Sequence, residues 1–247
     1  MKYIIFNWKS YLNLKQTQKL SRLIASFSKS RKHKIISAPS NFFTLNINSN
    51  FPKNIISAQN IDTHGLGAST GSLDISYLSE NKIEYCILGH SEVRSNFNET
   101  DCLVKQKLEL CLSNKIKPII CIGESEKIYK SKKTKNFLKN QIEDIFSKKI
   151  FYRELIIAYE PLWSIGTGLT PKIEEIDEIS SYLVKITKKY TFKNINILYG
   201  GSVNLTNVSD ILNLRNVNGV LVASNSTAIA QNTSRPLRIG TGSTEGS

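Results

Sequence analysis

YEPLWSIGTGL, residues 159–169, follows the apolar run Leu155–Ala158, which the sequence predicts to be a strand. This strand would deliver the carboxylate of Glu160 at its C-terminal end, and Pro161 stiffens the chain directly afterwards. Gly166 and Gly168 have no Cβ, so their backbone N–H groups are open to an anion. The pattern predicts a base on a rigid strand, followed by a loop that can close over a ligand. A lone glutamate before a proline would more often lie in a surface turn.

Two other segments place polar residues just past an apolar run: NWK (7–9) after Tyr3–Phe6, and HSE (90–92) after Tyr85–Leu88. Alone, Lys9 would more often be a solvated surface cation, and His90 a structural or exposed histidine. The presence of Lys9, His90 and Glu160 at three matching strand ends favours a shared functional site instead.

Strand-like runs alternate with helical patterns along most of the chain. The runs are short, apolar and rich in β-branched residues, which is typical of strands covered on both faces: Tyr3–Phe6, Lys34–Ala38, Ile55–Ala58, Tyr85–Leu88, Lys117–Ile122, Leu155–Tyr159, Ile195–Tyr199 and Gly219–Val222. Apolar residues recur at helical spacing between them, in Leu14–Phe27, Leu103–Leu112, Phe137–Phe146 and Ile173–Ile186. This alternation predicts an α/β protein folded as a (β/α)₈ barrel, whose active sites gather at the carboxyl ends of the strands.

The order and spacing of seven motifs resemble the triosephosphate isomerases. The match runs from Tyr3 to about Val222 and includes NWK (7–9), AQN (58–60), GASTG (67–71), GHSE (89–92), CIGE (121–124), EPLWSIGTG (160–168) and YGGSV (199–203). Each motif is weak alone, but the set in this order is highly specific. The resemblance implies a TIM barrel that interconverts dihydroxyacetone phosphate and D-glyceraldehyde 3-phosphate by proton transfer through an enediol(ate). It implies no cofactor and no metal.

The resemblance also implies a role for each residue around the substrate. Glu160 would be the base that removes a proton from the carbon beside the carbonyl. Negative charge then develops on the carbonyl oxygen, and a neutral His90 together with Lys9 would stabilise it. Asn7 would help to fix that oxygen and Lys9. Glu92 would orient Lys9 or help to move protons, unless it simply forms an ion pair with a nearby cation.

The phosphate of the substrate is expected to bind backbone amides. The resemblance assigns this contact to Gly166 and Ser202, while Tyr199 and Ser202 would hydrogen-bond the closed loop. Ala223 and Ser224 stand where the family has two glycines whose amides complete the phosphate site. If the backbone there needs a positive φ, each side chain adds strain of about 1 kcal/mol.

The end of the chain departs from the family. A final amphipathic helix is expected after Val222, but residues 223–247 have no helical apolar face, and Pro236 interrupts them. We therefore expect a barrel domain at 1–222, with its last helix atypical or missing, and an atypical tail at 223–247, disordered or non-native. A frame shift, read-through or vector-derived sequence would produce such an abrupt change. Leu169 and Val93 replace a common lysine and arginine and are peripheral.

The loop Asp62–Gly71 predicts assembly through the same resemblance. In the family this loop inserts into a neighbouring subunit, where its threonine, here Thr70, braces the active site. A homodimer is therefore expected.

Composition is ordinary for a soluble globular protein, with 247 residues, 40% of them apolar and 21% charged. No apolar run is long enough to span a membrane, and the chain enters a strand at Tyr3, which leaves no room for a signal peptide. The four cysteines lack a Cys-x-x-Cys spacing, and Cys86 and Cys121 lie in apolar runs, which favours buried, reduced thiols in a cytoplasm.

The net charge of +13 raises the question of a nucleic-acid partner. The cations are mostly scattered lysines, and the densest cluster, Lys127–Lys135, is better explained as a solvated helix face. We expect no nucleic-acid partner and a small anionic substrate, which a positive field would attract.

Two other functions stay open at this point. One is a catalytically impaired barrel that only binds phosphorylated ligands or partners, which the altered tail favours and the catalytic trio disfavours. The other is a barrel isomerase for a larger sugar phosphate, which would need a wider pocket than the short closing loop suggests.

Overall fold

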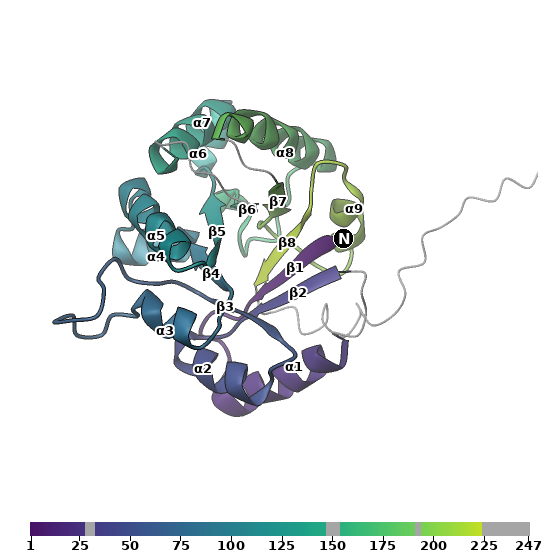
Figure 1. Ribbon diagram of the computed structural model, residues 1–247. Coiled ribbons are helices and arrows are strands. Elements are labelled where there is room, and N and C mark those ends of the chain that lie inside the picture. The colour runs from purple at the N-terminus through teal and green to yellow at the C-terminus, as the bar shows by residue number, and fades with distance from the viewer. Residues whose placement is uncertain (28–32, 147–153, 191–193, 224–247) are drawn as a thin grey trace, which may run out of the picture.

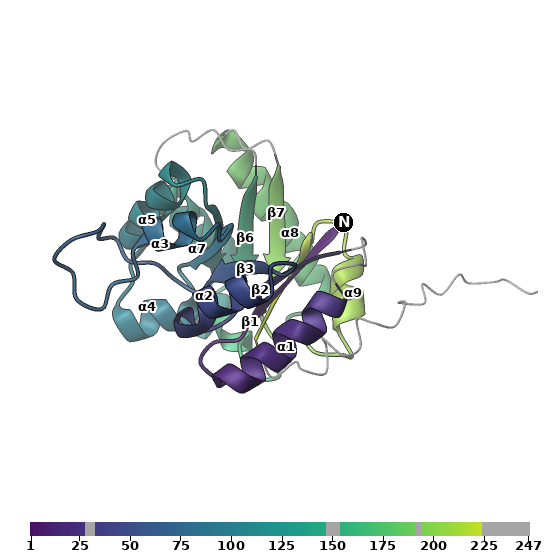
Figure 2. The ribbon, with the colours of Figure 1, turned by 60° about the horizontal axis from the view of Figure 1, so that its bottom comes forward.

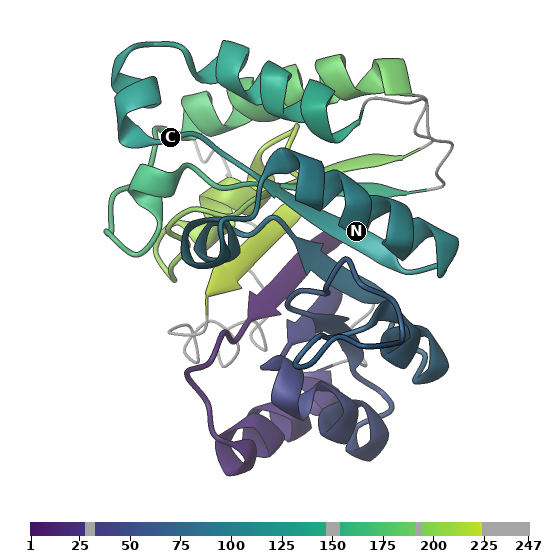
Figure 3. The ribbon, with the colours of Figure 1, turned by 90° about the vertical axis from the view of Figure 1, so that its left-hand side faces the viewer.

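The computed structural model describes residues 1–27, 33–146, 154–190 and 194–223. Within them, eight parallel strands form a closed barrel in the order of the sequence (Figure 1). The strands are β1 (Lys2–Asn7), β2 (His33–Ala38), β3 (Ile55–Ala58), β4 (Tyr85–Leu88), β5 (Lys117–Ile122), β6 (Leu155–Tyr159), β7 (Ile195–Tyr199) and β8 (Gly219–Ala223). The first and last strands lie side by side (Figures 1 and 3), and their pairing closes the barrel.

Helices follow the strands and cover the outside of the barrel (Figures 1 and 2). They are α1 (Leu14–Phe27), α2 (Asn41–Asn50), α3 (Ile75–Glu80), α4 (Ser91–Phe97), α5 (Asp101–Ser113), α6 (Glu126–Lys130), α7 (Thr134–Ile145), α8 (Ile173–Thr187) and α9 (Val208–Asn213), with 3₁₀ turns η1 (Leu162–Ser164) and η2 (Lys188–Tyr190). The predicted (β/α)₈ fold is therefore confirmed. None of the helices in the described ranges is long and apolar enough to cross a membrane.

The barrel wall is buried on both faces because side chains alternate along each strand. In β1, Tyr3 and Ile5 belong to the cluster inside the barrel, whereas Ile4 and Phe6 pack in the cluster that includes the helices. Burying one such side chain stabilises the fold by about 1.5–3 kcal/mol. The same alternation continues past the strand ends, so Asn7 follows Ile5 on the inner layer.

The cysteines agree with their predicted environment. Cys86 and Cys121 are buried in strands β4 and β5, Cys111 is buried in α5, and Cys102 is exposed. All four are free thiols.

Strand β8 runs one residue further than predicted, because Ala223 pairs with Asn7 of β1. The strain expected at Ala223 requires a positive φ, and Ala223 does not adopt one. Ser224, the tail to residue 247 and the atypical last helix all lie outside the described residues.

Candidate active site

A cavity of about 380 Å³ opens at the carboxyl ends of the strands. Its lining includes most of the predicted site residues: Asn7, Lys9, His90, Glu160, Gly166, Ser202 and Ala223. Glu92 lies beside it, bonded to Lys9, and Ser224 is outside the described residues. Segments that are far apart in the sequence therefore meet around one small pocket.

Lys9 is held in an unfavourable backbone conformation. Its φ is +46°, in the left-handed region that costs a residue with a side chain about 1–2 kcal/mol. Asn7 Oδ1 accepts a hydrogen bond from the Lys9 backbone N–H at 3.0 Å, and Gln59 Nε2 donates to the Lys9 carbonyl at 3.0 Å. Gln59 also donates to the carbonyl of Ala38 in β2. These bonds fix the backbone from which the ammonium reaches the pocket.

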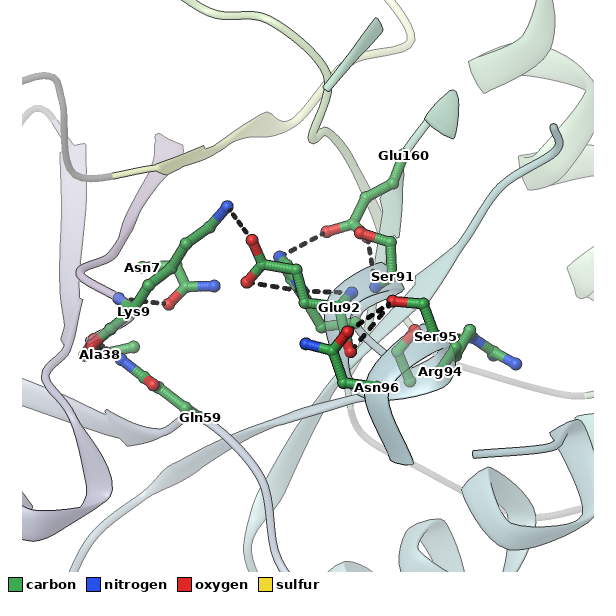
Figure 4. Close-up of polar contacts among 12 residues, drawn as sticks. Asn7, Lys9, Ala38, Gln59, Ser91, Glu92, Arg94, Ser95, Asn96 and Glu160 are labelled. Atoms are coloured by element: carbon green, nitrogen blue, oxygen red, sulfur yellow. Dashed lines mark hydrogen bonds and ion pairs between the residues drawn. The ribbon is translucent and has the colours of Figure 1, made fainter. Parts of the chain in front are cut away.

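The ammonium of Lys9 forms an ion pair with Glu92, with Nζ and Oε1 2.7 Å apart (Figure 4). The Lys9 side chain is 13% exposed and that of Glu92 48% exposed. Glu92 belongs to the first turn of α4, so this contact joins the first strand to the fourth. Water screens the half-exposed carboxylate, so the pair orients the Lys9 ammonium and adds little to the stability of the fold.

His90 is the residue that caps the N-terminus of α4. Its Nδ1 accepts a hydrogen bond from the backbone N–H of Glu92 at 3.2 Å. A nitrogen that accepts carries no proton, so the neutral ring has its proton on Nε2. Nε2 lies 3.6 Å from Oε1 of Glu160. The histidine thus presents a single N–H to the pocket.

The carboxylate of Glu160 is almost completely buried, with the residue 2% exposed. Its Oε2 accepts a hydrogen bond from the backbone N–H of Ser91 at 3.2 Å (Figure 4), at the N-terminus of α4, where a negative charge is favoured. Cys121 of β5 lies beneath it. Burial and the charge of Glu160 raise the pKa of the Cys121 thiol well above its ordinary value, so the thiol stays protonated.

Two glycines provide the space that Glu160 occupies. A Cβ on Gly123 would lie 1.7 Å from the Glu160 carbonyl oxygen, so β5 and the end of β6 approach closely only with glycine there. A Cβ on Gly200 would lie 2.8 Å from Cγ of Glu160. The glycine just past the end of β7 therefore leaves room for the Glu160 carboxylate in the pocket.

The loop after Glu160 is attached to the segment after β7. Ser164 Oγ lies 3.0 Å from the Tyr199 hydroxyl and accepts a hydrogen bond from the Ser202 backbone N–H at 3.2 Å. Burial raises the pKa of Tyr199 to about 12, so its hydroxyl remains available for this contact. The tip of the loop, Gly166–Leu169, is exposed. The loop is thus fixed near Ser164 while its tip faces solvent.

Gln59 and Glu124 belong to the motifs AQN and CIGE, but the sequence predicts no role for either residue. Gln59 fixes Lys9, as described above. Glu124 is fully buried and accepts hydrogen bonds from the Tyr159 hydroxyl at 3.1 Å and from Trp163 Nε1 at 3.3 Å. Desolvation raises the pKa of Glu124 above its ordinary value of 4.5. A glutamate two residues after the end of the apolar strand β5 is the signal that could have identified it.

The arrangement suits proton transfer on a small anion. A carboxylate, an imidazole N–H and an ammonium line one cavity of about 380 Å³, which has room for a small phosphorylated molecule. His90 and Glu160 are too close for a ligand to enter between them in the described state. A ligand that is to lie between these two side chains therefore requires the carboxylate to move.

Comparison with known proteins gives one consistent result. A family model described as triosephosphate isomerase matches residues 2–234. A triosephosphate isomerase of Mycoplasmoides gallisepticum is 34% identical over 90% of this chain and 91% of its own length. One from Francisella tularensis subsp. mediasiatica is 36% identical over 90% of each chain.

Proposed function

The chain belongs to the triosephosphate isomerase family, and we propose that Glu160, His90 and Lys9 carry out its reaction. That reaction is an intramolecular aldose–ketose isomerisation, in which dihydroxyacetone phosphate and D-glyceraldehyde 3-phosphate interconvert. The observation that supports these roles is the convergence of three chemically complementary groups on one pocket. The mechanism follows from the chemistry of each group.

Glu160 is the base. It removes a proton from the carbon beside the carbonyl and returns it to the adjacent carbon, so one carboxylate serves both directions. Its hydrogen bond to Ser91 N–H holds it ready in the resting site. When the loop closes, the carboxylate leaves this position and turns to the substrate carbons. Pro161, the next residue, keeps the backbone at this point stiff.

His90 and Lys9 stabilise the negative charge that develops on the substrate oxygens. The N–H of His90 Nε2 donates to the enediolate, and the neutral ring of His90 matches the acidity of the enediol better than a charged ring would, as is established in this family. The ammonium of Lys9 adds a full positive charge, and Asn7 keeps Lys9 in place. Donors that are already oriented need no reorganisation during the reaction.

The phosphate binds the backbone amides of Gly166 and Ser202, and Ala223 lines the same pocket. The resemblance gives Ser224 the same role, and that residue lies outside the described part of the chain. Contact with Gly166 brings the loop tip over the substrate. Closure excludes water, which suppresses elimination of phosphate from the exposed enediolate. In the described state Ser164 bonds the Tyr199 hydroxyl and the Ser202 N–H, so closure must release these contacts and free the Ser202 N–H for the phosphate.

Glu92 positions Lys9 in this proposal. The 2.7 Å ion pair supports that role, because it directs the ammonium along the edge of the pocket. Glu92 does not line the cavity itself, and proton relay by Glu92 is therefore the weaker alternative.

We propose a cytoplasmic homodimer. Exposed apolar side chains follow each of the first four strands: Tyr11, Phe42, Leu66 and Phe97. The loop Asp62–Gly71 projects from the barrel between β3 and α3 (Figures 1 and 2), and its neck is held by the bond from Asp62 N–H to the Leu73 carbonyl. Such a projecting, partly apolar surface fits a second copy, with Thr70 bracing the partner's site.

A coupled assay with D-glyceraldehyde 3-phosphate tests the assignment. The wild-type chain should turn over this substrate. The variant Glu160→Asp retracts the carboxylate by one methylene and should lower kcat about 100-fold or more, with little change in KM. Glu84→Asp is the matched control, because Glu84 is half-exposed and pairs with Lys117 just before β4, away from the pocket. Near-normal turnover in Glu160→Asp would remove Glu160 from the role of base, and an inactive wild type would favour the impaired barrel.

A further inference from the structure

Tyr129 contacts both ends of the loop that carries Gly166, although it lies on α6 and does not line the pocket. Its ring stacks on the ring of Trp163, with centroids 4.2 Å apart and planes inclined by 29°. Its hydroxyl lies 3.2 Å and 3.4 Å from the two carboxylate oxygens of Glu175. Trp163 is in η1 at the start of the loop, and Glu175 is in the first turn of α8, just past its end.

Both partners of Tyr129 are themselves anchored. Glu175 accepts a hydrogen bond from the backbone N–H of Lys172 at 3.1 Å and so caps α8. Trp163 donates to the buried Glu124 at 3.3 Å. Burial, followed by the charge and hydrogen bond of Glu175, raises the pKa of Tyr129, so its hydroxyl stays a donor. Tyr129 thus connects the two hinges of the loop.

The first hinge lies just after Glu160 in the chain. Within η1, Ser164 N–H donates to the Pro161 carbonyl at 2.8 Å, and Ile165 N–H donates to the Leu162 carbonyl at 3.3 Å. The turn after Glu160 is therefore one internally bonded unit. In the proposed function, closure of the loop moves this unit, and with it the ring of Trp163, relative to α6. The stack with Tyr129 is made in the described position and is lost or weakened when the unit moves.

We propose that Tyr129 is a positioning residue that holds the loop in its described position and so sets the balance between this state and the closed one. The described position is the open one in this proposal, because the loop tip is exposed and the Ser202 N–H is bonded to Ser164 Oγ. This inference rests on the proposed function, in which the loop closes over a phosphate. Removing the stack weakens the open state alone. Ligand should then bind more tightly, and product should leave more slowly.

Two variants separate the contacts of Tyr129. Tyr129→Leu removes the stack and the hydroxyl, and Tyr129→Phe removes the hydroxyl alone. Tyr182→Leu is the matched control, because Tyr182 on α8 packs near Lys135 rather than on the loop. The readouts are tryptophan fluorescence during titration with inorganic phosphate, and kcat and KM for D-glyceraldehyde 3-phosphate.

Tyr129→Leu should lower the Kd for phosphate about two- to tenfold, the range that one aromatic pair supports, and should lower kcat and KM together. Tyr129→Phe should lower the Kd by about twofold, and Tyr182→Leu should leave it unchanged. A phosphate affinity that is unchanged or weaker in both Tyr129 variants would overturn the proposal. If the leucine variant unfolds, the phenylalanine variant decides by the same criterion.

The titration does not need turnover. An inactive wild-type chain whose phosphate affinity still responds to Tyr129 would contradict the proposed function and leave the role of Tyr129 intact. An active chain whose phosphate affinity is unchanged in the Tyr129 variants would support the proposed function and contradict the role of Tyr129.

Discussion

Glu160 has two polar neighbours in the resting pocket, and substrate must separate it from both. Ser91 N–H donates to one carboxylate oxygen, and His90 Nε2 lies 3.6 Å from the other. The space for this side chain depends on Gly200, where a Cβ would approach Cγ of Glu160 to 2.8 Å. The position of the Glu160 carboxylate, the proposed base, therefore depends on these neighbouring residues.

Substitution of Gly200 tests that dependence. Gly200→Ala should displace the side chain of Glu160 and lower kcat about 10- to 100-fold, because small misplacements of a base are costly, while KM changes less. Steady-state kinetics measure both values. Ser113→Ala is the control, since Ser113 is an exposed residue at the end of α5 and does not line the pocket. Full activity in Gly200→Ala would show that the base tolerates the crowding.

The sequence predicted those site residues that belong to a recognisable local motif. Lys9, His90 and Glu160 each follow a recognisable strand, and all three line the cavity. The left-handed backbone of Lys9 and its bond to Gln59 could not be predicted, because they depend on contacts between β1 and the segment after β3. The same holds for Tyr129, whose partners are distant in the sequence.

At the scale of elements, strand β6 and the turn η1 both bond the buried carboxyl of Glu124, which lies just past β5. The Tyr159 hydroxyl and Trp163 Nε1 both donate to it. The predicted strands agree with the structure to within one residue at each end, because buried parallel strands have a strong apolar signature. Helix α2 was not predicted, since only Thr44 and Ile47 of its residues are buried and its sequence has no continuous apolar face.

The stability of the chain should carry a pH dependence from Glu124. Desolvation raises the pKa of Glu124 in the folded chain above its ordinary value of 4.5, so the folded state binds this proton more tightly than the unfolded state. The contribution of Glu124 therefore favours folding below its ordinary pKa and is lost as the pH rises through the folded pKa.

Thermal unfolding from about pH 4 to about pH 7 measures this effect. Glu124→Gln has no proton to lose, so its Tm relative to wild type should rise by a few degrees as the pH increases. Glu84→Gln, at an exposed site, should show no such trend. If the Tm of the wild type instead rose relative to that of Glu124→Gln with increasing pH, the raised pKa of Glu124 would be contradicted.

For the whole molecule, the barrel brings the first and last strands together, so Asn7 and Ala223 become neighbours at the pocket. The sequence predicted this closure from eight alternating strands and helices. It left the boundary at Val222 and the tail to 247 as hypotheses, and residues beyond Ala223 lie outside the described part of the chain.

The homodimer is tested by sedimentation equilibrium at micromolar concentration. The expected mass is twice the chain mass of 27.8 kDa. Phe42 is 95% exposed in the single chain, so Phe42→Ser should weaken the dimer without lowering the stability of the monomer. Tyr182→Ser, on the opposite half of the barrel, should leave the mass unchanged. A wild-type monomer would argue against the assembly.

The central claim is that groups from three strands act on one triose phosphate. Proton NMR of D-glyceraldehyde 3-phosphate incubated with the enzyme in D₂O tests it most directly, because a base that exchanges with solvent leaves deuterium on carbon. The wild type and Glu84→Gln should place deuterium on the carbons next to the carbonyl, and Glu160→Gln should abolish that incorporation. Undiminished incorporation with Glu160→Gln, or none with the wild type, would contradict the account.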